Sequence, residues 1–151
     1  MAIRQLRFNN DPILRKKSKE VSIVDDKIRE LLEDMMDTLH RSENGAALAA
    51  NQVGILKRLI VIDYEDYYLK LVNPMIVDSS GVQECIEACL SFPDQIGKTL
   101  RPQKVTVKAL NEKGEEVLLT VENNMAKCFC HEIDHLNGEV FIDKVIEFYK
   151  I

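Results

Sequence analysis

The segment Cys130-His131-Glu132-Ile133-Asp134-His135-Leu136-Asn137-Gly138 contains the pattern His-Glu-x-x-His, and we expect the fold to be organised around it. Two histidines four residues apart lie one above the other on a helix face, with Cβ atoms about 5–6 Å apart. One metal ion can bind a ring nitrogen of each, and zinc and iron both accept neutral imidazole. Glu132 can take a proton from a water molecule at that metal. The segment therefore predicts a metal site of the metalloprotease type.

The apolar residues around the segment have the spacing of an amphipathic helix, i, i+3, i+4, i+8 and i+11. They are Met125, Cys128, Phe129, Ile133 and Leu136. We expect Asn123 or Asn124 to cap the start of this helix, and Asn137-Gly138 suits its end. The alternative is a surface helix with two solvated histidines, but the chain has only three histidines and two of them lie here. The third, His40, is expected at the surface.

Length and composition predict a single globular domain spanning residues 1–151. The chain is 46% hydrophobic and 30% charged, with a formal net charge of −5, so it is a poor candidate for a general nucleic-acid binder. It has no apolar run long enough for a membrane span, and Met1-Ala2-Ile3-Arg4 opens no signal peptide. We therefore expect a cytoplasmic protein whose four cysteines are thiols or metal ligands, because that compartment keeps thiols reduced.

The remaining pattern predicts an α+β domain, with helices towards both ends of the chain and strands between them. Asp25 or Asp26 should cap a first helix of about four turns, which stops near 42–45. Strands are expected at 59–62, 71–77, 83–91, 104–110 and 116–121. Pro74 should mark an edge strand or a bulge, Phe92-Pro93-Asp94 a turn, and Asn111-Glu112-Lys113-Gly114 a hairpin.

The stretch Gly45-Ala46-Ala47-Leu48-Ala49-Ala50-Asn51-Gln52-Val53-Gly54 is rich in small residues, which indicates close packing of the backbone. Two interpretations remain open. The stretch is either a helix–strand junction or the wall of a narrow substrate cleft, with Gln52 as its one strong hydrogen-bonding side chain.

A catalytic metal also needs a third protein ligand. The candidates are Cys85, Cys89, Cys128 and Cys130. A competing hypothesis is a structural zinc held by all four cysteines. Residues i and i+2 of a helix point to different faces, so Cys128 and Cys130 are poorly placed to share an ion.

Three separated motifs resemble those of the peptide deformylases, in the same order and with similar spacing. They are Gly45-x-x-Leu48-Ala49-Ala50-x-Gln52, Glu87-x-Cys89-Leu90-Ser91 and His131-Glu132-x-x-His135. The resemblance implies the fold of that family, with antiparallel or mixed strands around a C-terminal helix that carries the histidines, plus an N-terminal helix. It also implies an enzyme that removes the formyl group from the formyl-methionine of nascent polypeptides and releases formate.

The resemblance also implies roles for individual residues. Cys89, His131 and His135 would hold one divalent metal, Fe(II) in the cell, with zinc, nickel or cobalt able to replace it. Glu132 would be the general base and later the acid, while the Gln52 side chain and the Leu90 backbone N–H would stabilise the oxyanion. The residues expected to contact or surround the substrate are Ala47, Ala88, Arg101, Cys85, Met125 and Cys128.

This chain departs from the family motifs at three positions. Ala47 and Ala88 stand where the family has glycines, and Cys130 stands where it has a glutamine. The added methyl groups should narrow the cleft or make a positive φ costly. We therefore interpret the chain as a divergent active enzyme. The alternatives are a metal-binding paralogue with weak or altered amidase activity, and a non-catalytic peptide-binding protein.

The resemblance implies formyl-methionine nascent peptides as partners. It also brings the exit region of the ribosome into consideration, although the chain after Asp143 is short for a long docking helix.

Overall fold

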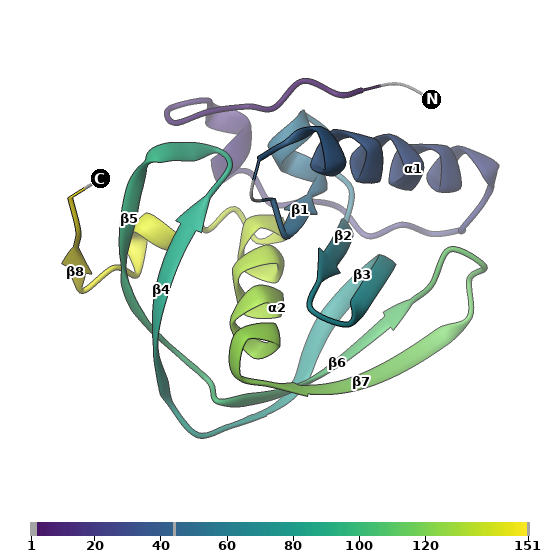
Figure 1. Ribbon diagram of the computed structural model, residues 1–151. Coiled ribbons are helices and arrows are strands. Elements are labelled where there is room, and N and C mark those ends of the chain that lie inside the picture. The colour runs from purple at the N-terminus through teal and green to yellow at the C-terminus, as the bar shows by residue number, and fades with distance from the viewer. Residues whose placement is uncertain (1–2, 44, 151) are drawn as a thin grey trace.

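The computed structural model describes residues 3–43 and 45–150 and has an α+β architecture in which helix α2 (Asn123–Leu136) lies between two sheets (Figure 1). The larger sheet has the strand order β1-β2-β3-β6-β7, and the smaller has the order β4-β5-β8. Helix α1 (Asp26–Arg41) packs against β1 and β2. The strands are β1 (Ala47–Ala49), β2 (Leu59–Tyr64), β3 (Tyr67–Ser80), β4 (Gln83–Cys89), β5 (Phe92–Arg101), β6 (Lys104–Leu110), β7 (Glu116–Glu122) and β8 (Glu147–Phe148). The expected fold class is confirmed.

Helix α1 forms as predicted. The Asp25 side chain accepts a hydrogen bond from the backbone N–H of Ile28 at 3.0 Å, which satisfies a donor of the first turn. The helix ends at Arg41, with Ser42 as its C-cap; Asn44, in the predicted stop, lies outside the described residues. Neither helix of the described part is long and apolar enough to cross a membrane.

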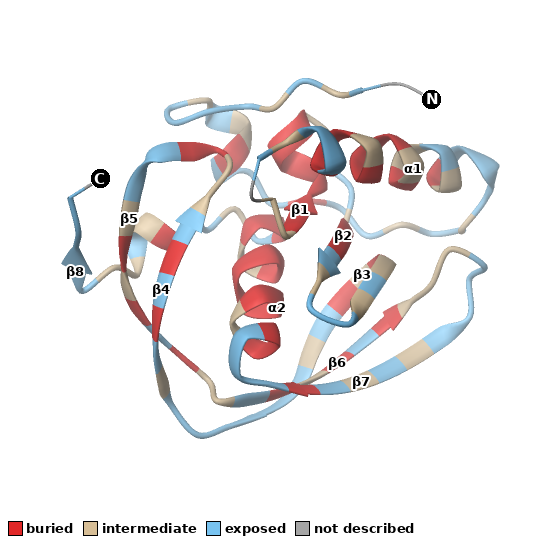
Figure 2. Ribbon diagram, viewed as in Figure 1, coloured by how far each residue is buried: buried red, intermediate tan, exposed pale blue. Residues whose placement is uncertain are grey.

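Most of helix α2 is buried, as Figure 2 shows. Its predicted start was wrong in one respect: the helix begins at Asn123, Glu122 is the N-cap, and no side chain caps it. Its end is confirmed at Asn137-Gly138. Gly138 has φ +76°, and a Cβ there would lie 2.5 Å from the carbonyl oxygen of Arg15, so a side chain would clash with backbone.

Strand β3 contains Pro74 but is not an edge strand, because β2 and β6 flank it. The proline sits instead at a bulge, where the register with β6 shifts between Val72 and Met75. Asn73 there adopts φ +52°, and its side chain bonds both backbone polar groups of Val21, at 2.8 Å each. Of the two alternatives predicted for Pro74, the bulge is therefore confirmed and the edge strand is not. The hairpin at 111–114 is confirmed by the bond from Gly114 N–H to Asn111 O, 3.0 Å.

Strand β5 was not predicted, and the expected turn at Phe92-Pro93-Asp94 was wrong. The turn lies at Leu90 and Ser91, and Phe92 begins β5. The missing alternation and the presence of Pro93 and Gly97 hid the strand. The pairing of β4 with β5 places Glu87, Thr99 and Arg101 in the interior beside α2. This second sheet therefore supplies the surroundings of the His-Glu-x-x-His helix.

Candidate metal and catalytic site

The end of β4 brings Cys89 to the two histidines of α2. The ligand atoms of Cys89, His131 and His135 all lie within 4.8 Å of one another, and Cys89 Sγ is 3.3 Å from Nε2 of His135. Among the residues that the structure describes, no other histidine, cysteine or acidic side chains form such a group. A thiolate with two imidazoles suits zinc or Fe(II), so the donors fit a transition metal. The four-cysteine zinc hypothesis finds no support in this geometry.

His131 is oriented by a buried carboxylate. Its Nδ1 lies 2.7 Å from Oε1 of Glu87, which leaves Nε2 for the metal site. Burial alone would raise the pKa of Glu87, but hydrogen bonds from Arg101 and His131 outweigh it and hold the pKa well below its usual range. Glu87 is therefore ionised and keeps the Nδ1 proton on His131. This arrangement is the common support for a metal-binding histidine.

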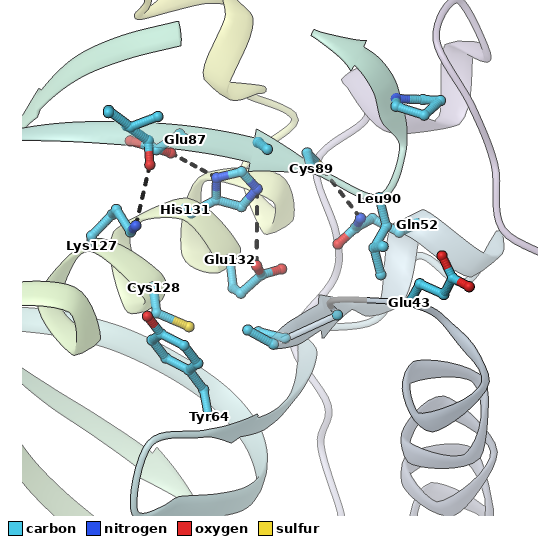
Figure 3. Close-up of a pocket in the computed structure, with 16 residues that line it drawn as sticks. Glu43, Gln52, Tyr64, Glu87, Cys89, Leu90, Lys127, Cys128, His131 and Glu132 are labelled. Carbon is cyan, nitrogen blue, oxygen red and sulfur yellow. Dashed lines mark hydrogen bonds and ion pairs between the residues drawn. The ribbon is translucent and has the colours of Figure 1, made fainter. Parts of the chain in front are cut away.

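Glu132 faces the same site from α2. Figure 3 shows it beside His131, and its Oε2 lies 4.0 Å from Nε2 of that residue. Its Oε1 is buried and has no hydrogen-bond partner among the described residues. Burial raises the pKa of Glu132 to about 7, against the opposing charge of His131. A carboxyl group with such a pKa can both take and return a proton near neutral pH.

Gln52 presents a fixed donor to the site. Its Oε1 accepts a hydrogen bond from the backbone N–H of Ala49 at 2.9 Å, so its amide nitrogen must point the other way. That nitrogen lies 3.1 Å from Oγ of Ser91. It also lies 3.5 Å from Sγ of Cys89, as Figure 3 shows. The 3-10 helix η2 (Ala50–Val53) carries Gln52, and β1 precedes it. The small-residue stretch is thus both a junction and a wall of the site.

These groups open into a cavity of about 660 Å³. Of the residues expected around the substrate, Ala47, Ala88 and Cys128 line the cavity, and so does Leu90. Neither alanine has a positive φ, so the expected backbone penalty does not arise. Sequence reasoning missed several lining residues, namely Glu43, Tyr64, Ile86, Pro93 and Lys127. No local spacing marked them.

Arg101, Cys85 and Met125 do not line the cavity, and their part in contacting or surrounding the substrate stays a prediction. Arg101 is 4% exposed and donates to Glu87 through Nε at 2.6 Å and Nη2 at 2.9 Å. Its Nη1 donates to Asp134 at 2.7 Å. Three of the five guanidinium N–H groups are therefore committed to carboxylates inside the protein. Met125 packs in the main hydrophobic core.

We expect Arg101→Met to lower the free energy of unfolding by about 3–5 kcal/mol, because it leaves the buried carboxylate of Glu87 unpaired. Lys144→Met is the matched control, since Lys144 Nζ also bonds Asp134, at 2.8 Å, but is 37% exposed. The control should cost at most about 1 kcal/mol. Urea denaturation of metal-free samples measures both. Equal losses for the two variants would contradict a buried orienting role for Arg101.

Comparison with known proteins agrees with this geometry. The chain matches the polypeptide deformylase family over residues 3–150. It is 60% identical over 150 residues to peptide deformylase 2 of Clostridium acetobutylicum, covering 99% of this chain and 100% of that one. It is 49% identical to the peptide deformylase of Acetivibrio thermocellus, covering 98% of this chain and 86% of the relative.

Solved structures give the same result. The peptide deformylase of Thermotoga maritima superposes with a TM-score of 0.92 at 35% identity, covering 96% of this chain and 99% of that one. The enzyme of Legionella pneumophila gives 0.91 at 41% identity, covering 95% and 86%. The site thus defines a metal-dependent amide hydrolase. The chain belongs to the polypeptide deformylase family, and its activity is that of a peptide deformylase.

Proposed function

We propose that residues 1–151 form one catalytic domain that removes the formyl group from the N-terminal formyl-methionine of nascent polypeptides. The observation that carries this proposal is that the ligand atoms of Cys89, His131 and His135 lie within 4.8 Å of one another, while Glu132 lines the same cavity as Cys89 and His131. A binding protein without catalysis has no need of a buried carboxyl group beside such a ligand set. The proposed site residues are therefore those of an active enzyme.

Cys89, His131 and His135 would hold one divalent metal ion, Fe(II) in the cell, with zinc, nickel or cobalt as substitutes. The bound cation supplies Lewis-acid activation of water and of the formyl carbonyl group. The chain's own contribution begins with the charge of the ligands. One thiolate and two neutral imidazoles would neutralise only one charge of a divalent cation, so the site would stay positive and favour an electron-rich carbonyl oxygen.

Glu132 would take the proton from the attacking water and return it to the amine that leaves. Both transfers need one group that is ionised at the start and protonated in between, near neutral pH. The buried Oε1 has no partner within residues 3–43 and 45–150 and is available for the first transfer. No second acid is needed.

Gln52 and Leu90 would stabilise the oxyanion that develops on the formyl group. The Ala49 N–H fixes the Gln52 amide, so the donor needs no reorganisation when charge appears. The second donor would be the backbone N–H of Leu90, next to Cys89. A donor of this kind is worth about 2.7–4 kcal/mol of the activation barrier.

The methionine side chain would occupy the part of the cavity formed by Tyr64, Ile86 and Cys128. Burial raises the pKa of the Cys128 thiol far above its usual value, so this wall stays neutral. Ala88 lies on β4, an edge strand of the smaller sheet, where an extended peptide can pair with backbone groups. Ala47 faces the cavity from β1. We propose that the enzyme works on nascent chains in the cytoplasm, near the ribosome exit region.

The decisive experiment is anaerobic purification followed by metal analysis and a formate-release assay on the same sample. We expect about one iron per chain and rapid deformylation of a formyl-Met-Ala-Ser peptide. Full metal content without formate release would favour the non-catalytic binding protein. Release from other formylated amides, but not from formyl-methionine peptides, would favour the altered paralogue.

A further inference from the structure

The second histidine of the ligand group and a residue hydrogen-bonded to its backbone each have a buried polar atom with no hydrogen-bond partner among the described residues. These atoms are Nδ1 of His135 and Oδ1 of Asn51, on side chains that are 1% and 0% exposed. The residues are in direct contact, because Nδ2 of Asn51 donates to the backbone carbonyl of His135 at 2.7 Å. One atom is a potential donor and the other an acceptor, so their requirements are complementary.

The protonation of the His135 ring follows from the site geometry. Nε2 is the nitrogen that faces Cys89, at 3.3 Å from Sγ, so a metal bound there leaves the proton on Nδ1. Metal-binding histidines nearly always donate that second proton to a nearby acceptor, which sets the tilt and basicity of the ring. His131 gives its proton to Glu87, 2.7 Å away. Nδ1 of His135 has no carboxylate partner of this kind in the part of the chain that the structure describes.

We propose that Asn51 is the positioning residue for His135, receiving the Nδ1 proton on its Oδ1 through one buried water molecule. The proposal rests on the ligand set proposed above. Buried waters commonly satisfy groups of this type. Both ends of the Asn51 amide then act on one residue, with Nδ2 on the backbone and Oδ1 on the ring.

This role gives the short helix η2 a second function. Gln52 faces Cys89 from η2, while Asn51, the preceding residue, holds His135 on α2. The adjacent side chains of Asn51 and Gln52 thus each contact one proposed metal ligand, His135 on α2 and Cys89 on β4. Position 51 is one of the open positions of the first family motif, so the motif itself does not account for this asparagine.

The test uses zinc-loaded protein labelled with ¹⁵N at histidine, observed by long-range proton–nitrogen NMR. In the wild type we expect His135 as the Nδ1-protonated tautomer, with slow solvent exchange. In Asn51→Ala the exchange at His135 should rise at least tenfold and remain unchanged at His131. Zinc release to a chelator should be about 10–100-fold faster, the usual cost of losing such a partner.

Val53→Ala is the control, because Val53 is a buried apolar residue of the same turn. It should lower the melting temperature without changing proton exchange at His135 or zinc release. Equal effects of the two variants would overturn the proposal. So would rapid exchange at His135 in the wild type, a result that needs no variant to fold.

The readouts separate this role from catalysis. Slow exchange at His135 in a wild type that binds zinc but releases no formate would refute the enzymatic function and support the positioning role. A wild type that binds no zinc would overturn the ligand set and the positioning role together.

Discussion

Glu132→Gln should reduce kcat/KM for formyl-Met-Ala-Ser by about 10²–10⁴-fold while one metal per chain is retained. General acid–base assistance typically supplies a factor of this size. Glutamine keeps the shape of the side chain but cannot accept the proton of water. Because Glu132 is not one of the three clustered ligands, the metal should stay. Steady-state kinetics and elemental analysis on the same anaerobic sample measure both quantities.

Glu139→Gln provides the chemical control for this prediction. It is the same substitution on an exposed side chain that lies outside the cavity and near Lys144, at 3.8 Å. Its kcat/KM should equal that of the wild type within about twofold, as for a surface substitution away from any special feature. Near-normal activity of Glu132→Gln, with metal in place, would remove Glu132 from the proton transfers.

Cys89→Ser should weaken metal binding by more than about 100-fold, because even the loss of an outer hydrogen-bond partner costs 10–100-fold. A serine hydroxyl is far less acidic than a thiol and cannot replace a thiolate in this set. Purified Cys89→Ser should therefore contain much less than one metal per chain. It should show correspondingly little formate release.

Cys130→Ser is the matched variant, since Cys130 directly precedes His131 but packs in the main hydrophobic core. Burial raises the pKa of its thiol to about 11, so it is not a thiolate at neutral pH. This variant should retain its metal. Metal retained in Cys89→Ser and lost in Cys130→Ser, measured by anaerobic elemental analysis, would reverse the assignment of the third ligand.

Local spacing was sufficient for the features that lie within a few turns of one helix or one hairpin. The i, i+4 pair His131 and His135 is correctly placed on a buried helix, because apolar periodicity and side-chain direction are both local properties. The cap at Asp25 and the hairpin at 111–114 were predicted for the same reason. The choice of Cys89 among four cysteines did not follow from spacing and needed the family resemblance.

Features that depend on pairing between distant segments could not be predicted from local spacing. The sequence of strand β5 does not alternate between apolar and polar residues. The strand forms by antiparallel pairing with β4. Arg101 carries the charge of a substrate-binding residue, but β5 turns it inward onto Glu87, 14 residues away in sequence. A buried ion pair of this kind cannot be distinguished from a surface charge until both strands are placed.

The sequence by itself determined the α+β class, the buried histidine helix and, through three motifs, the family. Only the tertiary structure decided which carboxylate supports His131, which residues line the cavity and where Asn51 lies. Asn51 and His135 are 84 residues apart and Glu87 and His131 are 44 apart, so no helical or strand period links them. Their contacts exist because burial forces each polar group to find a partner from whichever element packs beside it.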